Sequence, residues 1–263
     1  MDRKTLPIDG LLIHYDVVGH GPDVVFVHGW ASSQRMWGHV ITELSAHFRC
    51  WSLDLPGCGD SDRPVDHWYS IPNFTALVRN FLVANRLRRV RLVGHSMGGM
   101  ISLNLAARHP ELIEQLVAIN PVVTGNSHLR RLAHPGRRRQ VLQWLLRISP
   151  RVLQPLLSTG TSLRVQGVHH IRRRTEDFFK VSPGALLSSG RAIVAYDLSP
   201  QLPRIAAPTL VIVGDRDLNV PTSEGRLAAR QIGGARLHVM RAGHMATDDR
   251  PTEVVRQLQD FFV

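Results

Sequence analysis

Short apolar runs alternate with longer segments of helical periodicity along most of the chain. The run from Val24 to Val27 is apolar at every position, and the runs that end at Gly94 and Gly214 are nearly so. Runs of this kind are typical of strands that are buried on both faces of a parallel sheet. Strands are therefore predicted over residues 11–18, 24–28, 49–54, 90–94, 116–120, 209–214 and 236–241.

Apolar residues at helical spacing occupy the stretches between most of these strands. Helices are predicted over residues 34–47, 71–87, 97–108, 221–231 and 251–262. Pro251 stands at a helix start, and Gly233 and Gly234 follow a helix end, which are the usual positions of these residue types. The alternation predicts an α/β fold with a mostly parallel central sheet. The polar first strand is expected at an edge, with the turn from Gly19 to Pro22 joining it to the second strand as a hairpin.

The alternation stops after Asn120 and resumes near Leu202. The intervening segment has helical spacing and is interrupted by turn-forming residues, namely Pro135-Gly136, Pro150, Pro155, Gly160 and Pro183-Gly184. A chain of 263 residues has the length of one domain with an insertion rather than of two equal domains. We therefore expect an α/β core formed by residues 1–121 and 200–263, with a helical cap inserted over residues 122–199.

The composition is that of a globular chain, with 43% hydrophobic and 20% charged residues. No apolar run approaches the roughly 20 residues that a membrane helix needs, and no apolar segment of an export signal follows the N-terminal MDRK. The two cysteines, Cys50 and Cys58, favour reduced thiols over a disulfide framework. These features predict a cytoplasmic protein without a membrane span.

The net charge of +11 is concentrated in one segment of the predicted cap. Between His128 and Lys180, twelve basic residues stand against two acidic ones, which gives this segment a charge of +10. No recognition motif accompanies the charge, so nucleic-acid binding is not predicted. Two interpretations remain open: a solvated arginine-rich helix surface, or a lid that attracts an anionic partner such as an acidic acyl carrier protein, a CoA thioester or a carboxylate-bearing ester. The basic residues are Arg130, Arg131, Arg137, Arg138, Arg139, Arg147, Arg151, Arg164, Arg172, Arg173, Arg174 and Lys180.

The segment from Arg91 to Gly99 reads RLVGHSMGG, a strand that runs through G-x-S-x-G into a helix. This is the context of a nucleophile elbow, in which glycines allow a tight turn and the serine hydroxyl is exposed above the sheet edge. Ser96 is therefore the candidate nucleophile. The backbone N–H of Met97, the next residue, is one expected oxyanion donor. His95 shapes the elbow and is predicted to bind substrate.

A serine hydroxyl needs an adjacent base, and histidine serves best because its pKa lies near neutral pH. Among the 14 histidines, His244 follows the last predicted strand and is therefore expected at the carboxyl edge of the sheet, where Ser96 also lies. His169 and His170 lie in the predicted cap, where substrate contact and simple packing are both open. No pair of histidines has the spacing of metal ligands, so neither a metal nor a cofactor is predicted.

The histidine in turn needs a carboxylate to fix its tautomer, and the strand 209–214 is followed by two candidates, Asp215 and Asp217. The elbow and the chain order of serine, acid and His244 resemble the α/β-hydrolase family, and the resemblance covers nearly the whole chain outside the cap. That family places its acid three residues after the glycine that ends this strand. The resemblance therefore implies Asp217, with Asp215 as the alternative.

Two loops extend the resemblance. His28, Gly29 and Trp30 are similar to the family's H-G-x oxyanion loop, which implies that the N–H of Trp30 is the second oxyanion donor, that its indole lines the acyl pocket and that His28 is structural. The segment 54–61 resembles the family's D-x-x-G-x-G-x-S loop, with Cys58 where an aromatic residue or histidine is common. Because no histidine or acid is spaced to activate it, Cys58 is not expected to act as a nucleophile.

The resemblance implies a serine hydrolase that cleaves carboxylic esters through an acyl-enzyme intermediate. The H-G-W loop and the arginine-rich cap are similar to microbial carboxylesterases, including the pimeloyl-acyl-carrier-protein methyl ester esterases, whose usual elbow reads G-W-S-x-G. Hydrolysis of carrier-protein or CoA-linked esters, of C–C bonds, lactones or amides, and cofactor-free perhydrolysis remain alternatives on the same fold. Dehalogenase and epoxide hydrolase chemistry are disfavoured, because both use aspartate at the position of Ser96. A non-catalytic relative is disfavoured by the complete triad.

Overall fold

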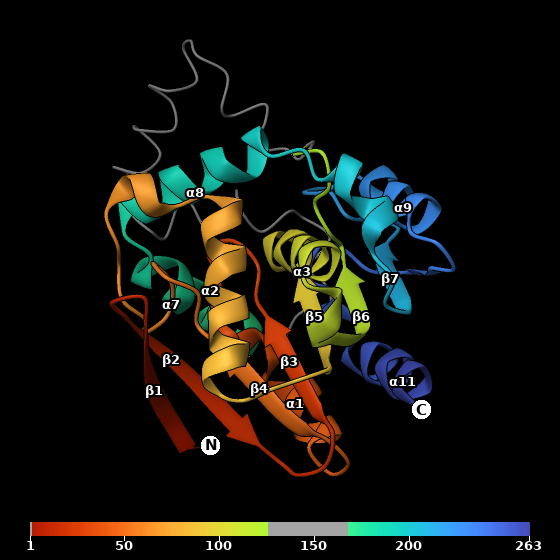
Figure 1. Ribbon diagram of the computed structural model, residues 1–263, viewed down its shortest axis with the longest axis horizontal. Helices are drawn as coiled ribbons and strands as arrows, with labels where there is room; N and C mark the ends of the chain where they lie inside the picture. The colour runs from red at the N-terminus through yellow and green to blue at the C-terminus, as the bar shows by residue number, and fades with distance from the viewer. Residues whose placement is uncertain (1, 126–167) are drawn as a thin grey trace.

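The computed structural model describes residues 2–125 and 168–263. Within these ranges, eight strands form one sheet in the order β1-β2-β4-β3-β5-β6-β7-β8 (Figure 1). All neighbouring pairs from β4 to β8 are parallel, whereas β2 is antiparallel to both β1 and β4. The strands are β1 (Asp2–Ile8), β2 (Leu11–Val18), β3 (Asp23–Val27), β4 (Arg49–Leu53), β5 (Val90–His95), β6 (Ile113–Ile119), β7 (Thr209–Gly214) and β8 (Arg236–Met240).

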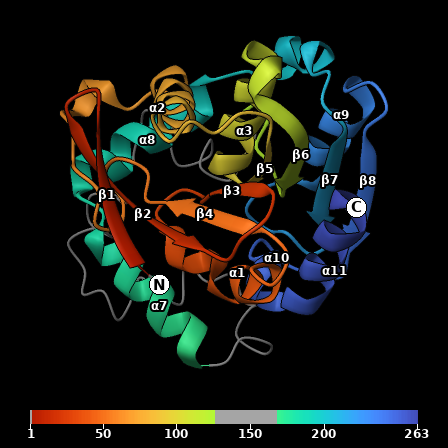
Figure 2. The same ribbon diagram turned by 60° about the horizontal axis from the view of Figure 1, so that its bottom comes forward.

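Helices cover both faces of the sheet (Figure 2). One face carries α1 (Gly38–Leu44), α10 (Ala246–Asp249) and α11 (Pro251–Phe262). The other carries α2 (Ile71–Ala84), α3 (Met97–Arg108) and α9 (Thr222–Gln231). Short 3-10 turns lie at η1 (Gln34–Trp37), η2 (Asp66–Trp68), η3 (Pro110–Leu112) and η5 (Ser199–Arg204). The predicted α/β architecture with a mostly parallel sheet is confirmed.

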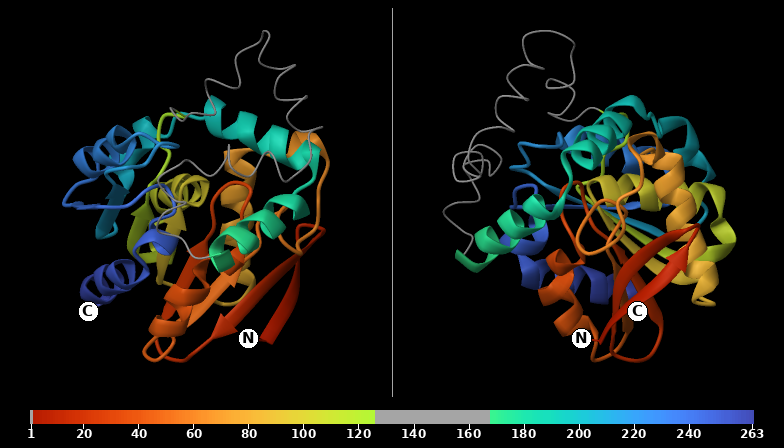
Figure 3. Two further views of the ribbon diagram at one scale, coloured as in Figure 1. Left: turned by 180° about the vertical axis from the view of Figure 1, so that it is seen from behind. Right: turned by 90° about the vertical axis from the view of Figure 1, so that its left-hand side faces the viewer.

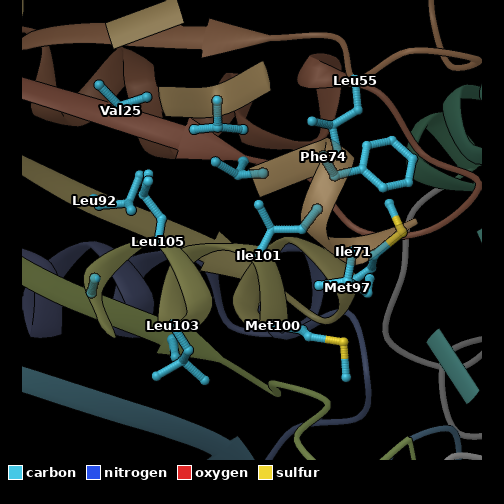
Figure 4. Packing of buried hydrophobic residues seen from close by; sticks show 14 of the residues in the cluster. Val25, Leu55, Ile71, Phe74, Leu92, Met97, Met100, Ile101, Leu103 and Leu105 are labelled. Atoms are coloured by element: carbon cyan, nitrogen blue, oxygen red, sulfur yellow. The ribbon is translucent and has the colours of Figure 1, made fainter. Parts of the chain in front are cut away.

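Successive residues of the central strands enter two different hydrophobic clusters. Val25 and Leu92 pack with residues of α2 and α3 on one face (Figure 4). The residues that follow them, Phe26 and Val93, belong to the cluster under α1 and α11 on the opposite face. Because both faces are buried, consecutive positions in the middle of these strands are apolar. Each fully buried side chain of this size stabilises the fold by about 1.5–3 kcal/mol.

The N-terminal hairpin differs from the prediction. The edge strand is β1, which the sequence reading missed, and β2 pairs with β1 and β4 rather than forming a hairpin with β3. The turn between β1 and β2 consists of Asp9 (φ 50°) and Gly10 (φ 81°), the residue types that a two-residue hairpin favours. Pro7 and the charged residues of β1 obscured the strand, although both are tolerated at a sheet edge. The sequence signal that could have revealed β1 is the Asp9-Gly10 pair, because Asp-Gly is typical of a two-residue hairpin turn.

Most other elements have the predicted positions, with changes at their ends. β2, β7, α3 and α11 have the predicted bounds. The helix expected over 34–47 is divided into η1 and α1 and ends at Leu44. Helix α2 ends at Ala84, before Arg86 adopts a left-handed backbone (φ 57°) that a helix cannot continue through.

The predicted cap falls partly in residues 126–167, which lie outside the described ranges. Its described part contains α7 (Val168–Lys180) and α8 (Pro183–Ala195), which lie outside the sheet (Figure 3). The bounds of the whole cap, residues 122–199, stay a prediction. Among the residues that the structure describes, no helix is long and apolar enough to cross a membrane.

Candidate active site

Ser96 occupies the turn between β5 and α3 with a backbone that few non-glycine residues adopt (φ 54°, ψ −114°). The flanking glycines make this turn possible. A Cβ on Gly94 would collide with the carbonyl oxygen of Gly98, and a Cβ on Gly98 would collide with that of Val27. A backbone of this kind costs on the order of 1–3 kcal/mol and is stabilised by the structure around it. Strand, turn and helix thus have the geometry that the G-x-S-x-G segment predicted.

The structure brings Ser96, His244 and Asp217 together at the carboxyl ends of β5, β7 and β8. The Ser96 hydroxyl Oγ lies 3.1 Å from Nε2 of His244. On the other side of the ring, Nδ1 lies 2.7 Å from Oδ2 of Asp217. An ionised carboxylate only accepts, so Nδ1 carries the proton and Nε2 is left to accept the serine hydroxyl proton.

Asp217 is held as a carboxylate by its surroundings. Its side chain is 1% exposed, and its Oδ1 accepts the backbone N–H groups of Asn219 at 2.7 Å and Val220 at 2.9 Å. Burial raises its pKa, but the charge and hydrogen bond of His244, with the two N–H donors, outweigh this and lower the pKa below its ordinary value. Asp215, the alternative acid, is exposed, so the acid that contacts His244 is Asp217.

Two side chains bind the backbone of His244. Nε2 of His95 donates to the carbonyl oxygen of His244 at 2.8 Å, and Nδ2 of Asn120 donates to the same oxygen at 2.8 Å. His95 is buried, and its pKa falls to about 3 because of burial and the neighbouring His244 ring. His95 was predicted to bind substrate, and its described hydrogen bond is to this backbone. The sequence analysis did not identify Asn120 as a site residue. The signal that could have found it is an asparagine at the end of a strand, where a left-handed backbone (φ 45°) suits this residue type.

The loop after β3 lies against the elbow. A Cβ on Gly29 would lie 3.3 Å from the Cβ of Ser96, so the backbone of Gly29 lies close to the nucleophile, and Trp30 is the next residue along the chain. His28 is buried and neutral, with Nδ1 donating to the Gly29 carbonyl at 2.8 Å and Nε2 accepting the N–H of Leu55 at 2.9 Å. Burial lowers its pKa to about 4, and these bonds give it the structural position expected from the sequence.

The indole of Trp30 connects this loop to α8. Its Nε1 donates to the carbonyl oxygen of Leu186 at 3.2 Å and to Oγ of Ser189 at 3.1 Å. Gly190, which directly follows Ser189 in α8, lies beside the ring, and a Cβ added to it would lie 3.4 Å from the indole. The indole therefore lies between the elbow and the second described helix of the predicted cap.

The segment 54–61 forms a tight loop. Asp54 accepts the N–H groups of Gln34 at 2.8 Å and Asp60 at 3.0 Å, and Ser61 Oγ donates to the Asp54 carbonyl at 2.7 Å. Cys58 is a buried free thiol, and burial raises its pKa to about 12. A thiol with such a pKa is protonated at neutral pH and is a poor nucleophile.

The fold is that of one known family. Residues 22–251 match the family described as alpha/beta hydrolase fold, and the chain belongs to it.

Relatives in this family have different substrates. The chain is 30% identical to "2-hydroxy-6-oxo-6-phenylhexa-2,4-dienoate hydrolase" of Comamonas testosteroni, over 97% of this chain and 92% of the relative. It is 28% identical to "Pimeloyl-[acyl-carrier protein] methyl ester esterase" of Nitrosomonas europaea, over 86% and 89% of the two chains. The solved structure of a bromoperoxidase from Bacillus anthracis shares the fold, with a TM-score of 0.88, 23% identity and 99% coverage of both chains.

Proposed function

We propose that this protein is a serine hydrolase that cleaves carboxylic esters through an acyl-enzyme intermediate, with Ser96, His244 and Asp217 as its catalytic triad. The observation that carries the proposal is the chain of contacts from Ser96 Oγ through His244 to Asp217, at 3.1 Å and 2.7 Å. Both distances are within hydrogen-bond reach, which is the first requirement for a nucleophile and its base.

The steps follow from these atoms. Nε2 of His244 takes the hydroxyl proton of Ser96 as Oγ attacks the ester carbonyl carbon, and the imidazolium that forms is stabilised by the carboxylate of Asp217. Nε2 then gives this proton to the departing alkoxide, which leaves as the alcohol. Water attacks the acyl-enzyme in the same way, with His244 again accepting and returning the proton, and Ser96 is regenerated with release of the acid.

The negative oxygen of each tetrahedral intermediate needs donors that are already in place. We assign this role to the backbone N–H groups of Met97, at the start of α3, and of Trp30, beside the elbow. Support comes from the close approach of the Gly29 backbone to Ser96 and from the position of Met97 directly after the nucleophile. Loss of one such donor costs on the order of 10²- to 10³-fold in turnover.

The test is a panel of p-nitrophenyl acyl esters from acetate to palmitate, combined with phenylmethylsulfonyl fluoride. We expect hydrolysis that depends on acyl length, loss of activity with the sulfonyl fluoride, and attachment of the sulfonyl group to the peptide that carries Ser96. Hydrolysis of 2-hydroxy-6-oxo-6-phenylhexa-2,4-dienoate, the compound in the name of the relative from Comamonas testosteroni, but of no ester would move the assignment to C–C bond cleavage. No hydrolysis of either substrate and no labelling of Ser96 would refute the triad.

The basic segment supports a narrower proposal: an anionic ester, or one carried on an acidic carrier protein, is the preferred substrate. Among its cations in the described ranges, Arg172, Arg173 and Lys180 bind Glu176, Asp248 and Asp60. Arg174 also lies in the described α7, and the remaining eight of the twelve basic residues, from Arg130 to Arg164, lie outside the described residues. The charge of +10 therefore rests on the sequence alone. The free, buried thiols of Cys50 and Cys58 support a location in the reducing cytoplasm.

Salt tests this preference, because attraction between separated charges is screened over about 10 Å at 0.1 M ionic strength. We expect kcat/KM for an anionic ester to fall as ionic strength rises, while that for a neutral ester of equal size stays constant. Replacing Arg137, Arg138 and Arg139 by glutamate should remove the difference. An identical response of both esters in the unmodified protein would show that the charge has no role in substrate choice.

A further inference from the structure

Helix α7 is bound by ion pairs to the two segments that flank the candidate active site. On one side, Arg35 of η1, which follows the Trp30 loop, lies 2.9 Å from Glu176 and 3.2 Å from Asp177. On the other side, Arg173 binds Asp248 of α10, the turn that directly follows the His244 loop. A helix from the segment between β6 and β7 thus connects two loops of the core.

The contact between Arg173 and Asp248 is buried, and one nitrogen of Arg173 reaches both oxygens of the carboxylate. Nη2 of Arg173 donates to Oδ2 at 2.8 Å and Oδ1 at 3.1 Å, and the two side chains are 10% and 1% exposed. His170, one turn earlier, places Nδ1 3.3 Å from the same carboxylate. By contrast, Arg172 on the same helix is 79% exposed and pairs with Glu176 within α7. Arg173 and His170 thus both join α7 to α10, and the Arg173 contact is the shorter of the two. Buried charged pairs hold their partners in a fixed geometry.

Asp248 belongs to the same hydrogen-bonded unit as His244. The N–H groups of Asp248 and Asp249 both donate to the carbonyl oxygen of Met245 at 2.9 Å. Oδ2 of Asp249 accepts the N–H of Gly243 at 2.7 Å. These hydrogen bonds join the backbone from Gly243 to Asp249 into one unit that contains His244. A displacement of Asp248 therefore displaces this unit.

We propose that Arg173 is a positioning residue: by fixing Asp248, it sets the distance between Nε2 of His244 and Oγ of Ser96. The inference rests on the proposed function, since it concerns the same base and nucleophile. Arg173 acts through the loop and takes no part in the proton transfer. A displacement of about 1 Å at a reacting pair can cost on the order of 10²-fold in rate, so the contact need not lie at the reaction centre to matter.

The first test compares Arg173→Met with Arg172→Met, which removes the same charge from the adjacent, exposed position. On p-nitrophenyl butyrate we expect Arg173→Met to lower kcat by about 10- to 100-fold with little change in KM. Arg172→Met should stay within about twofold of the unmodified protein, because exposed pairs contribute little. Arg173→Lys keeps the charge but loses the planar guanidinium, which also donates through Nη1 to the carbonyl oxygen of Arg35, and it should give an intermediate kcat. A change confined to KM would show that Arg173 contacts substrate and would overturn the proposal.

Asp248→Asn completes a double-mutant cycle. If both residues act through one contact, Arg173→Met combined with Asp248→Asn should lower kcat no further than the more damaging single change. If the losses in kcat of the two single variants multiply in the double variant, the two residues act independently, and the proposal is contradicted. The combination also keeps the test usable when Arg173→Met folds poorly, because it leaves no unpaired carboxylate in a buried place. Thermal unfolding of each variant separates loss of fold from loss of positioning.

Proton NMR gives a readout that needs no substrate. The Nδ1 proton of His244, hydrogen-bonded to Asp217, should give a far-downfield resonance that disappears in Asp217→Asn. We expect this resonance to shift or broaden in folded Arg173→Met and to stay unchanged in Arg172→Met. An unchanged resonance and unchanged kcat in Arg173→Met would overturn the positioning role. If the unmodified protein neither hydrolyses esters nor labels at Ser96, the proposed function fails, while the resonance still decides whether Arg173 positions His244.

Discussion

Ser96→Ala should remove ester hydrolysis while leaving the fold in place. The change deletes the attacking oxygen, whose contact in the structure is with Nε2 of His244. Loss of a triad serine typically lowers turnover by about 10⁶-fold, because the remaining groups bind the ester without a nucleophile. Alanine is no more strained than serine at φ 54°, so the midpoint of thermal unfolding should move by no more than a few degrees.

Ser102→Ala is the matched control for this experiment. Ser102 is buried in α3, close behind the elbow, and its Oγ has no hydrogen-bond partner among the described residues. This variant loses the same atom and should keep nearly full activity. If Ser96→Ala retained more than a few per cent of turnover after exclusion of contaminating esterase, Ser96 would not be the nucleophile.

Asp217→Asn should lower kcat by roughly 10⁴-fold, as neutralising the acid does in other serine triads. The backbone N–H groups of Asn219 and Val220 bind Oδ1 and would keep the amide oxygen on their side. The NH₂ group would then face Nδ1 of His244 and donate to it. The imidazole would carry its proton on Nε2, pointing at the Ser96 hydroxyl, and could no longer act as a base.

Asp215→Asn is the control for this prediction. Asp215 has the same chemistry two residues away, but it is exposed, whereas the Asp217 side chain is 1% exposed. We expect Asp215→Asn to stay within a few-fold of the unmodified enzyme. Equal losses in the two variants would leave the acid unassigned, and a larger loss in Asp215→Asn would transfer the role to that residue. Turnover of p-nitrophenyl butyrate at saturating concentration measures both.

The sequence by itself determined the fold class and the residue types at the candidate site. Runs buried on both faces predict parallel strands, and G-x-S-x-G between a strand and a helix predicts the turn at Ser96. These signals are local: a strand, a turn and a helix start are each specified within a few residues. His244 could be chosen from its position after the last predicted strand. Asp217 could be chosen because it follows another strand and matches the acid position of the family that the chain resembles.

Local signals could not show which residues meet across long stretches of chain. Asn120 binds the His244 carbonyl from 124 residues away, and Arg173 binds Asp248 from 75 residues away. Which of Asp215 and Asp217 contacts His244 likewise depends on how the loop after β7 packs beside the loop after β8. Strand β1 was missed because an edge strand tolerates charges and proline, and its pairing with β2 forms only in the folded chain.

What the tertiary structure alone decided is the geometry of the candidate site. It set the 3.1 Å and 2.7 Å contacts of His244, the hydrogen bonds that keep the buried Asp217 ionised, and the ion pairs that join α7 to two core loops. The physical reason is that distance, burial and electrostatic field arise from all the elements packed around a group. A residue's own neighbours in the sequence specify its local conformation, but they do not specify which distant side chains it meets.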